Sequence, residues 1–110
     1  MSYKVDTIVH FERQAKKLIK KYRSLKAELA MLIEQLEDKP TQGTDLGNST
    51  YKIRLAIASK GKGKSGGARV ITCVKVVQEK VYLVAIYDKS QLESLSKEQI
   101  LELLHNAGLS

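Results

Sequence analysis

The hydrophobic pattern of this chain changes its period at Pro40, and this change limits the folds that the chain can adopt. Before Pro40, apolar residues recur every three or four positions, which is typical of amphipathic helices. After position 50 they alternate with polar residues, which is typical of strands with one buried face. The 110 residues are enough for one modest hydrophobic core. We therefore expect a single α+β domain over residues 1–110.

Two helices are predicted in the first part of the chain, after a short strand at residues 3–9. The first helix has its apolar stripe at Phe11, Ala15, Leu18, Ile19 and Tyr22. The second helix follows Ser24, a candidate N-cap, and ends at Lys39 before Pro40. Its stripe consists of Leu25, Leu29, Leu32, Ile33 and Leu36. The short link between the stripes predicts an antiparallel helical hairpin, and the turn-forming residues 40–49 predict a loop.

Three strands and a last helix are predicted after this loop. The strands cover residues 51–58, 68–77 and 80–88, and the two-residue break before the third predicts an antiparallel hairpin. Ser96 and Gln99 have the spacing of a capping box, and Gly108 is a typical residue just beyond a helix end. The expected order is β-α-α-β-β-β-α, with the helices packed on one face of a mainly antiparallel sheet.

The net positive charge of the chain lies entirely between Leu46 and Gln78. This segment contains no Asp or Glu, while the rest of the chain balances 12 basic residues against 12 acidic ones. Its seven basic residues are Lys52, Arg54, Lys60, Lys62, Lys64, Arg69 and Lys75. Such a concentration predicts a surface for polyanions, most often the phosphate backbone of a nucleic acid.

Several kinds of site are not expected from the sequence. The one cysteine, Cys73, cannot form a disulfide within the chain, and it is too far from His10 and His105 in sequence to suggest a zinc site. The Gly-Lys-Ser string at 63–65 is not a P-loop, because Ala58 stands where the motif requires a glycine. A P-loop must also lead into a helix, whereas a strand is predicted to follow this string. No apolar leader and no run of 18 apolar residues is present. We expect a soluble, cytoplasmic protein that binds no metal and no membrane.

Lys52 and Arg54 are the strongest candidate site residues. They share one face of a predicted strand, about 7 Å apart, and Arg69 begins the next strand. Neighbouring positive charges favour the neutral form of a lysine, so Lys52 is a candidate base. Arginine suits a phosphate that carries extra charge in a transition state. RNA can be cut this way without metal, because its own 2′-hydroxyl is the nucleophile. The alternative is that these side chains are only solvent-facing charges.

Further candidates lie in the loop 59–67 and at the end of the last strand. The lysines of the loop, Lys60, Lys62 and Lys64, are predicted to contact RNA phosphates, unless the loop is only a solvated connection. Tyr87 is placed to stack on a base, unless it only begins a turn. A mechanism based on two histidines would require the fold to bring His10 and His105 together.

The order of several short strings resembles the RelE/ParE toxin superfamily, and most closely its HigB-type branch. These strings are Leu46-Gly47, Tyr51-Lys52-Ile53-Arg54-Leu55, Lys64-Ser65-Gly66-Gly67-Ala68-Arg69-Val70-Ile71, Val81-Tyr82-Leu83 and Tyr87-Asp88-Lys89-Ser90. The resemblance implies the toxin of a bacterial toxin–antitoxin pair. Such a toxin cuts messenger RNA on the ribosome without metal or cofactor, inhibits translation, and is neutralised by a protein antitoxin.

The resemblance also assigns roles to single residues. Lys52 and Arg54 match the basic pair of the family, and Arg69 matches the arginine that stabilises the phosphate. Lys89 stands near the arginine that follows the last strand in RelE-type enzymes. Because no tyrosine follows Tyr87, this residue is the candidate for the family's aromatic contact. Two other functions remain open: a ParE-like poison of DNA gyrase, and a non-catalytic module that binds RNA or the ribosome.

Overall fold

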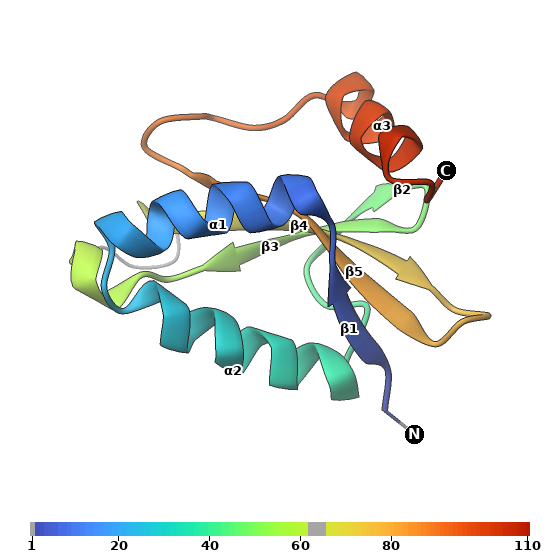
Figure 1. The fold of residues 1–110 in the computed structure, drawn as a ribbon, viewed down its shortest axis with the longest axis horizontal. Coiled ribbons are helices and arrows are strands. Elements are labelled where there is room, and N and C mark those ends of the chain that lie inside the picture. The colour runs from blue at the N-terminus through green and yellow to red at the C-terminus, as the bar shows by residue number, and fades with distance from the viewer. Residues whose placement is uncertain (1, 62–65) are drawn as a thin grey trace.

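The fold is a five-stranded sheet with three α-helices, and its element order contains one strand more than predicted (Figure 1). A computed structural model describes residues 2–61 and 66–110. The elements are β1 (Lys4–Thr7), α1 (Val9–Lys21), α2 (Leu25–Asp38), β2 (Thr44–Gly47), β3 (Thr50–Leu55), the 3-10 turn η1 (Ala58–Lys60), β4 (Ala68–Lys75), β5 (Lys80–Asp88) and α3 (Lys97–Asn106). The mixed α+β class is therefore confirmed.

The strands lie in the order β1-β5-β4-β3-β2. All neighbouring strands are antiparallel except β1, which runs parallel to β5. The helical link between β1 and the rest of the chain accounts for this parallel pair, since a parallel strand requires a long crossover. The sheet is mainly antiparallel, as the alternating pattern after position 50 predicts.

The predicted loop 40–49 was wrong in part, because it contains the edge strand β2. Gly43 has a positive φ of 98°, and a Cβ atom on it would lie 2.5 Å from the carbonyl oxygen of Lys52. Asn48 and Ser49 also have positive φ, as a tight two-residue hairpin turn between β2 and β3 requires. This short strand is held by backbone pairing and by the turn that follows it. Its side chains do not alternate between apolar and polar, so the sequence pattern could not predict it.

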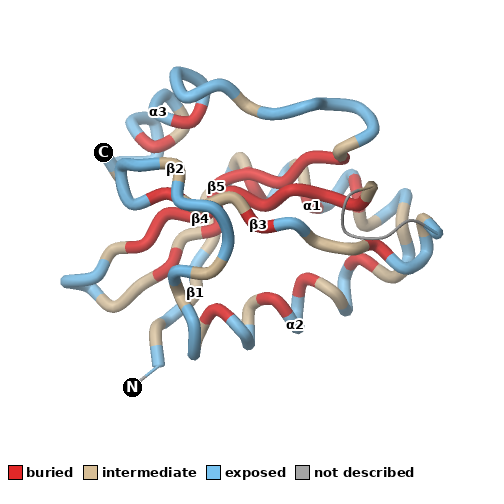
Figure 2. Tube along the Cα trace, turned by 180° about the vertical axis from the view of Figure 1, so that it is seen from behind, coloured by how far each residue is buried: buried red, intermediate tan, exposed pale blue. Residues whose placement is uncertain are grey.

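The helices cover both faces of the sheet, and the prediction that all pack on one face was wrong for α3. The apolar stripes of α1 and α2 form one core with Ile53, Val70 and Leu83. Helix α3 buries Ile100 and Leu104 on the other face. Residues 89–96 carry the chain across to that face (Figure 1), and the buried strands β4 and β5 lie between the two helical layers (Figure 2).

The helix ends differ in how they are capped. The capping box of α3 is confirmed, since Ser96 and Gln99 each accept a hydrogen bond from the other's backbone amide. Ser24 does not cap α2 in the predicted way. It has helical backbone angles, and its hydroxyl contacts Glu28 and Ser59 instead of a backbone amide of α2. These contacts fasten η1 to the turn between α1 and α2.

A β-bulge in β5 decides which way the end of this strand faces. Ile71 pairs with Ala85 and Thr72 pairs with Leu83, so Val84 is an extra residue. An extra residue reverses the alternation of side chains that follow it. Tyr87 therefore lies on the α3 face of the sheet, while Asp88 lies on the face covered by α1.

Candidate active site

Three of the predicted site residues lie in one row across the sheet, and a fourth lies beside it. Arg54 of β3 is directly opposite Arg69 of β4, and Arg69 is directly opposite Tyr87 of β5. Lys52 lies two residues before Arg54 and pairs with Ile71. Since neighbouring strands are about 4.8 Å apart, the pairing of β3 with β4 brings Lys52, Arg54 and Arg69 close together on one face of the sheet.

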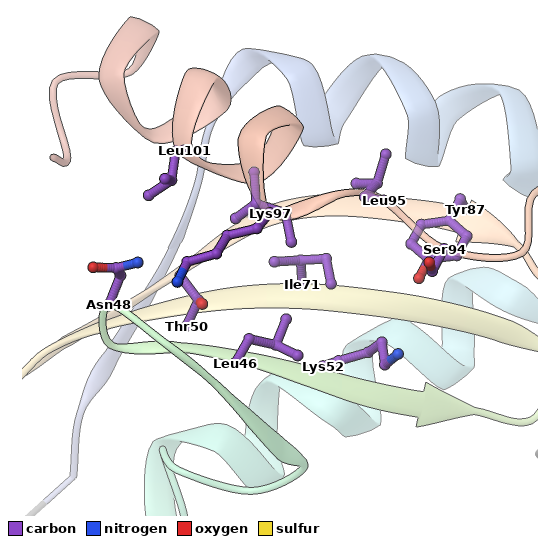
Figure 3. A pocket seen from close by; sticks show the side chains of 11 residues that line it. Leu46, Asn48, Thr50, Lys52, Ile71, Tyr87, Ser94, Leu95, Lys97 and Leu101 are labelled. Carbon is purple, nitrogen blue, oxygen red and sulfur yellow. The ribbon is translucent and has the colours of Figure 1, made fainter.

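A pocket of about 130 Å³ opens beside this row, between the sheet and the start of α3 (Figure 3). Its lining combines apolar residues with the ammonium groups of Lys52 and Lys97. Figure 3 shows Lys97 reaching from α3 toward Thr50. No acidic side chain lines the pocket among the described residues. The pocket therefore suits an anionic ligand with an apolar or planar part.

The two arginines of the row differ in their environment. Arg69 is only 4% exposed and donates a hydrogen bond from Nη1 to the Ala68 carbonyl oxygen at 3.1 Å. Arg54 is exposed. The edge strand β2 pairs with β3 only as far as Lys52 and does not extend beside Arg54. The buried guanidinium is held in place, while the exposed one can adapt to a ligand.

Tyr87 lines the pocket but is only 8% exposed. Its ring face is therefore not available for stacking on a base in this conformation. Its hydroxyl is buried and has no hydrogen-bond partner within the described part of the chain. Burial raises the pKa of this hydroxyl, and the Leu95 backbone and the Arg69 charge oppose that shift. Tyr87 thus keeps its proton at neutral pH and holds an unused donor near the row.

Lys60 does not have the environment that the sequence suggested. Its ammonium pairs with Asp88, and the exposed fractions of the two side chains are 9% and 0%. It also donates to Ser90 and lies over the ring of Tyr22. The segment from Leu46 to Gln78 contains no acidic residue, but Asp88 lies outside this segment and pairs with Lys60 in the fold. Lys62 and Lys64 lie outside the described residues.

Asp88 is the centre of a buried polar cluster beneath the row. Burial alone would raise the pKa of its carboxyl, but hydrogen bonds from Lys60, Tyr22 and Ser90 outweigh this effect and hold the pKa well below its usual range. The Tyr22 hydroxyl donates to Asp88 Oδ2 at 2.6 Å. This bond, followed by burial, raises the pKa of Tyr22. The cluster joins the end of α1, η1 and the end of β5.

Lys89 lies beyond the end of β5 and is not among the residues that line the pocket. Its ammonium is 2.9 Å from Glu93 Oε1, and the Glu93 side chain is 92% exposed. The hydrogen bond from Lys89 lowers the pKa of Glu93. A pair this exposed is weak, so Lys89 can exchange Glu93 for another anion.

Other residues near the site were missed from the sequence or lie elsewhere. Thr50, Ser94 and Lys97 line the pocket. Of these three, only Lys97 has a position that the sequence indicates, because it follows the predicted helix cap Ser96. His10 lines a different pocket, beside the C-terminal residues. His105 is exposed near the end of α3 and contacts Ser110. The structure therefore gives no support to a mechanism based on two histidines.

Within residues 2–61 and 66–110, no group of three or more His, Cys, Asp or Glu side chains could hold a metal ion. Among the same residues, no helix is long and apolar enough to cross a membrane.

Comparisons with known proteins bear on the family and the fold of this chain. Residues 7–109 match the family profile of the RelE toxin of the RelE/RelB toxin–antitoxin system. A mutant of the Escherichia coli toxin RelE in the free state is 19% identical, with a TM-score of 0.64 over 93% of this chain and 97% of that one. The toxin–antitoxin complex RelBE2 from Mycobacterium tuberculosis contains a chain that is 15% identical, with a TM-score of 0.57 over 80% of this chain and 92% of that one. At these identities, the two structures show a shared fold.

Proposed function

We propose that this chain, which belongs to the RelE toxin family, is a messenger RNA endoribonuclease that acts on translating ribosomes without a metal ion. In this proposal it is the toxin of a bacterial toxin–antitoxin pair, of the HigB-like branch. It inhibits translation, and a protein antitoxin neutralises it in the cytoplasm.

The observation that carries this proposal is the row formed by Arg54, Arg69 and Tyr87, with Lys52 beside it. Two arginines directly opposite each other repel, and such pairs lower stability. Arginines held close in this way are suited to a shared anion. A phosphate that gains charge in its transition state is such an anion, and preorganised donors stabilise it strongly.

The chemistry that we propose uses only groups of this face. The 2′-oxygen of the RNA attacks the adjacent phosphorus after losing its proton, for which Lys52 is the candidate base. Arg54 and Arg69 stabilise the charge on the phosphorane oxygens. The bond to the 5′-oxygen then breaks, and this oxygen takes a proton. The Tyr87 hydroxyl, which is protonated and lacks an acceptor among the described residues, is the candidate donor, and Lys89 is a candidate for a further phosphate contact.

The test compares Arg54→Ala with Arg23→Ala. Both arginines are exposed and both changes remove one positive charge, but Arg23 lies in the turn between α1 and α2. Arg54→Ala is expected to lower mRNA cleavage about 100-fold or more and to abolish growth arrest, while Arg23→Ala keeps both. Arg69→Ala should lose cleavage too, but its burial requires a parallel check of folding.

Other outcomes of the same comparison would contradict the proposal. Full cleavage by a folded Arg54→Ala or Arg69→Ala protein would remove the row from the mechanism. Cleaved DNA with intact mRNA after induction would instead indicate a gyrase poison. RNA binding without any cut ends would indicate a non-catalytic module.

A further inference from the structure

The pocket between the sheet and the start of α3 has apolar walls and the size of one small ring. Its volume is about 130 Å³, and a cavity of about 150 Å³ in a protein core holds a benzene molecule. Its apolar lining residues are Leu46, Ile71, Leu95, Ile100 and Leu101, and Figure 3 shows Ile71 near the middle of the pocket. These walls suit the faces of a planar ring, and the volume favours a pyrimidine base over a purine.

Lys97 supplies this pocket with hydrogen-bond donors. It is the first residue of α3 and is exposed, and Figure 3 shows its side chain extending along the pocket toward Thr50. The capping box of Ser96 and Gln99 fixes the helical turn from which it extends. In the part of the chain that the structure describes, its ammonium forms no ion pair. Its N–H groups can therefore bind a ligand, and an ammonium cannot accept a hydrogen bond.

The same pocket offers few acceptors to an amino group. No Asp or Glu lines it among the described residues. Thr50 donates its hydroxyl proton to the Gly47 carbonyl oxygen at 2.6 Å, and its own oxygen faces the ammonium of Lys97 (Figure 3). Asn48 and Ser94 can both donate and accept, so they favour neither kind of ligand. A carbonyl oxygen placed beside Lys97 would be paired, whereas an amino group there would leave two donors without partners.

We propose that this pocket binds a pyrimidine base, that it prefers uracil to cytosine, and that Lys97 is the residue that distinguishes them. Uracil carries a carbonyl oxygen on each side of its ring, so it presents one to Lys97 in either orientation. Cytosine has an amino group in place of one of these oxygens. The phosphate of the same nucleotide, or of its neighbour, would lie on the row beside the pocket. That the base belongs to messenger RNA rests on the proposed function, but its binding does not require cleavage.

A phosphate group fits the pocket less well than a base. It would satisfy the ammonium groups of Lys52 and Lys97, but the apolar walls would remove water from its other oxygens without replacing the lost hydrogen bonds. The row already offers Arg54 and Arg69 to a phosphate. The division of the site into a charged row and a largely apolar pocket therefore favours a phosphate on the row and a base in the pocket.

The experiment measures the binding of two short single strands, one of deoxyuridine and one of deoxycytidine, to the full chain by fluorescence anisotropy at low salt. Neither strand contains a 2′-hydroxyl, so the proposed cleavage cannot occur. The deoxyuridine strand should bind about fivefold or more tightly than the other. Lys97→Gln places an amide that both donates and accepts, so it should reduce this ratio to less than about twofold. Lys97→Arg keeps a side chain that only donates and should keep the preference.

The matched control is Lys17→Gln, which removes one exposed lysine charge from α1 and does not line the pocket. It should leave the ratio of the two affinities unchanged, and circular dichroism checks that each variant is folded. Equal binding of the two strands by the unchanged protein, or a full preference in folded Lys97→Gln, would overturn the proposal. Equal binding that Lys97→Gln weakens for both strands would instead place a phosphate beside Lys97.

The two assignments of this site can fail separately. A chain that prefers the deoxyuridine strand but cuts no RNA would contradict only the nuclease assignment. A chain that cuts messenger RNA on ribosomes but binds the two strands equally would contradict only the recognition of the base by Lys97.

Discussion

At the scale of single residues, the pairing of Arg54 with Arg69 predicts a conflict between stability and activity. Like charges directly opposite each other in a sheet are destabilising. Arg54→Ala should therefore raise the free energy of unfolding by about 0.2–1 kcal/mol at low salt, although it removes cleavage. The gain should shrink as salt screens the repulsion. Urea unfolding at two salt concentrations measures this, with Arg23→Ala as the control. A loss of stability would mean that Arg54 has a favourable partner.

The buried hydroxyl of Tyr87 leads to a second prediction at this scale. Leaving a buried polar group without a partner costs about 1–3 kcal/mol. Tyr87→Phe removes only this group, so the free energy of unfolding should stay the same or rise. If the hydroxyl donates the proton to the leaving oxygen, the same change should lower cleavage by about 100-fold. Stability can be followed by thermal unfolding and cleavage by single-turnover kinetics. A destabilised variant with full activity would show that the hydroxyl has a structural role.

At the scale of elements, the cluster around Asp88 joins the end of α1, η1 and the end of β5. The pKa of Asp88 is lower in the folded protein than the ordinary value of about 3.9. Its contribution to stability is therefore fully present well above pH 4, and it is lost as the pH falls below that value. Asp88→Asn should weaken the fold at neutral pH and flatten the decline in stability between about pH 5 and pH 3. Urea unfolding across this range tests the prediction, and an unchanged decline would contradict it.

The ion pair of Lys60 with Asp88 supplies a matched comparison for this cluster. Removing one partner of a buried pair typically costs about 3–5 kcal/mol. Lys60→Met should therefore destabilise the protein strongly, because it leaves the Asp88 carboxylate without its cation. Lys75→Met, at the end of β4, changes a basic residue outside the cluster and should cost much less. Similar unfolding midpoints for the two variants would show that the pair contributes little.

The elements also show what could be predicted from the sequence. A period of two fixed the faces of Lys52 and Arg54, and strand pairing then brought Arg69 beside them. The bulge at Val84 could not be predicted, because it depends on pairing between strands, and it reverses the faces of Tyr87 and Asp88. Lys60 was misinterpreted because Asp88 is close in space but far along the chain. Strand β2 depends on backbone pairing with β3, and the position of α3 depends on the path of residues 89–96. Neither of these leaves a periodic pattern of apolar residues in the sequence.

At the scale of the whole molecule, the sheet separates two surfaces with different chemistry. One face carries the row of Arg54, Arg69 and Tyr87 with its pocket, and the helical layer on the other face carries an apolar groove with lysines along its rim. The core between them is formed by α1 and α2 with the strands. The proposed RNA contacts lie on the first of these faces.

The most direct test of the central claim is to map both ends of RNA fragments made by the purified chain, with and without ribosomes. Attack by the 2′-oxygen predicts a 2′,3′-cyclic phosphate on one fragment and a 5′-hydroxyl on the next, and cuts should appear only in mRNA on ribosomes. Equal cleavage of naked RNA would contradict ribosome dependence. Fragments with 5′-phosphates, or mRNA that remains intact on ribosomes, would contradict the proposed nuclease itself.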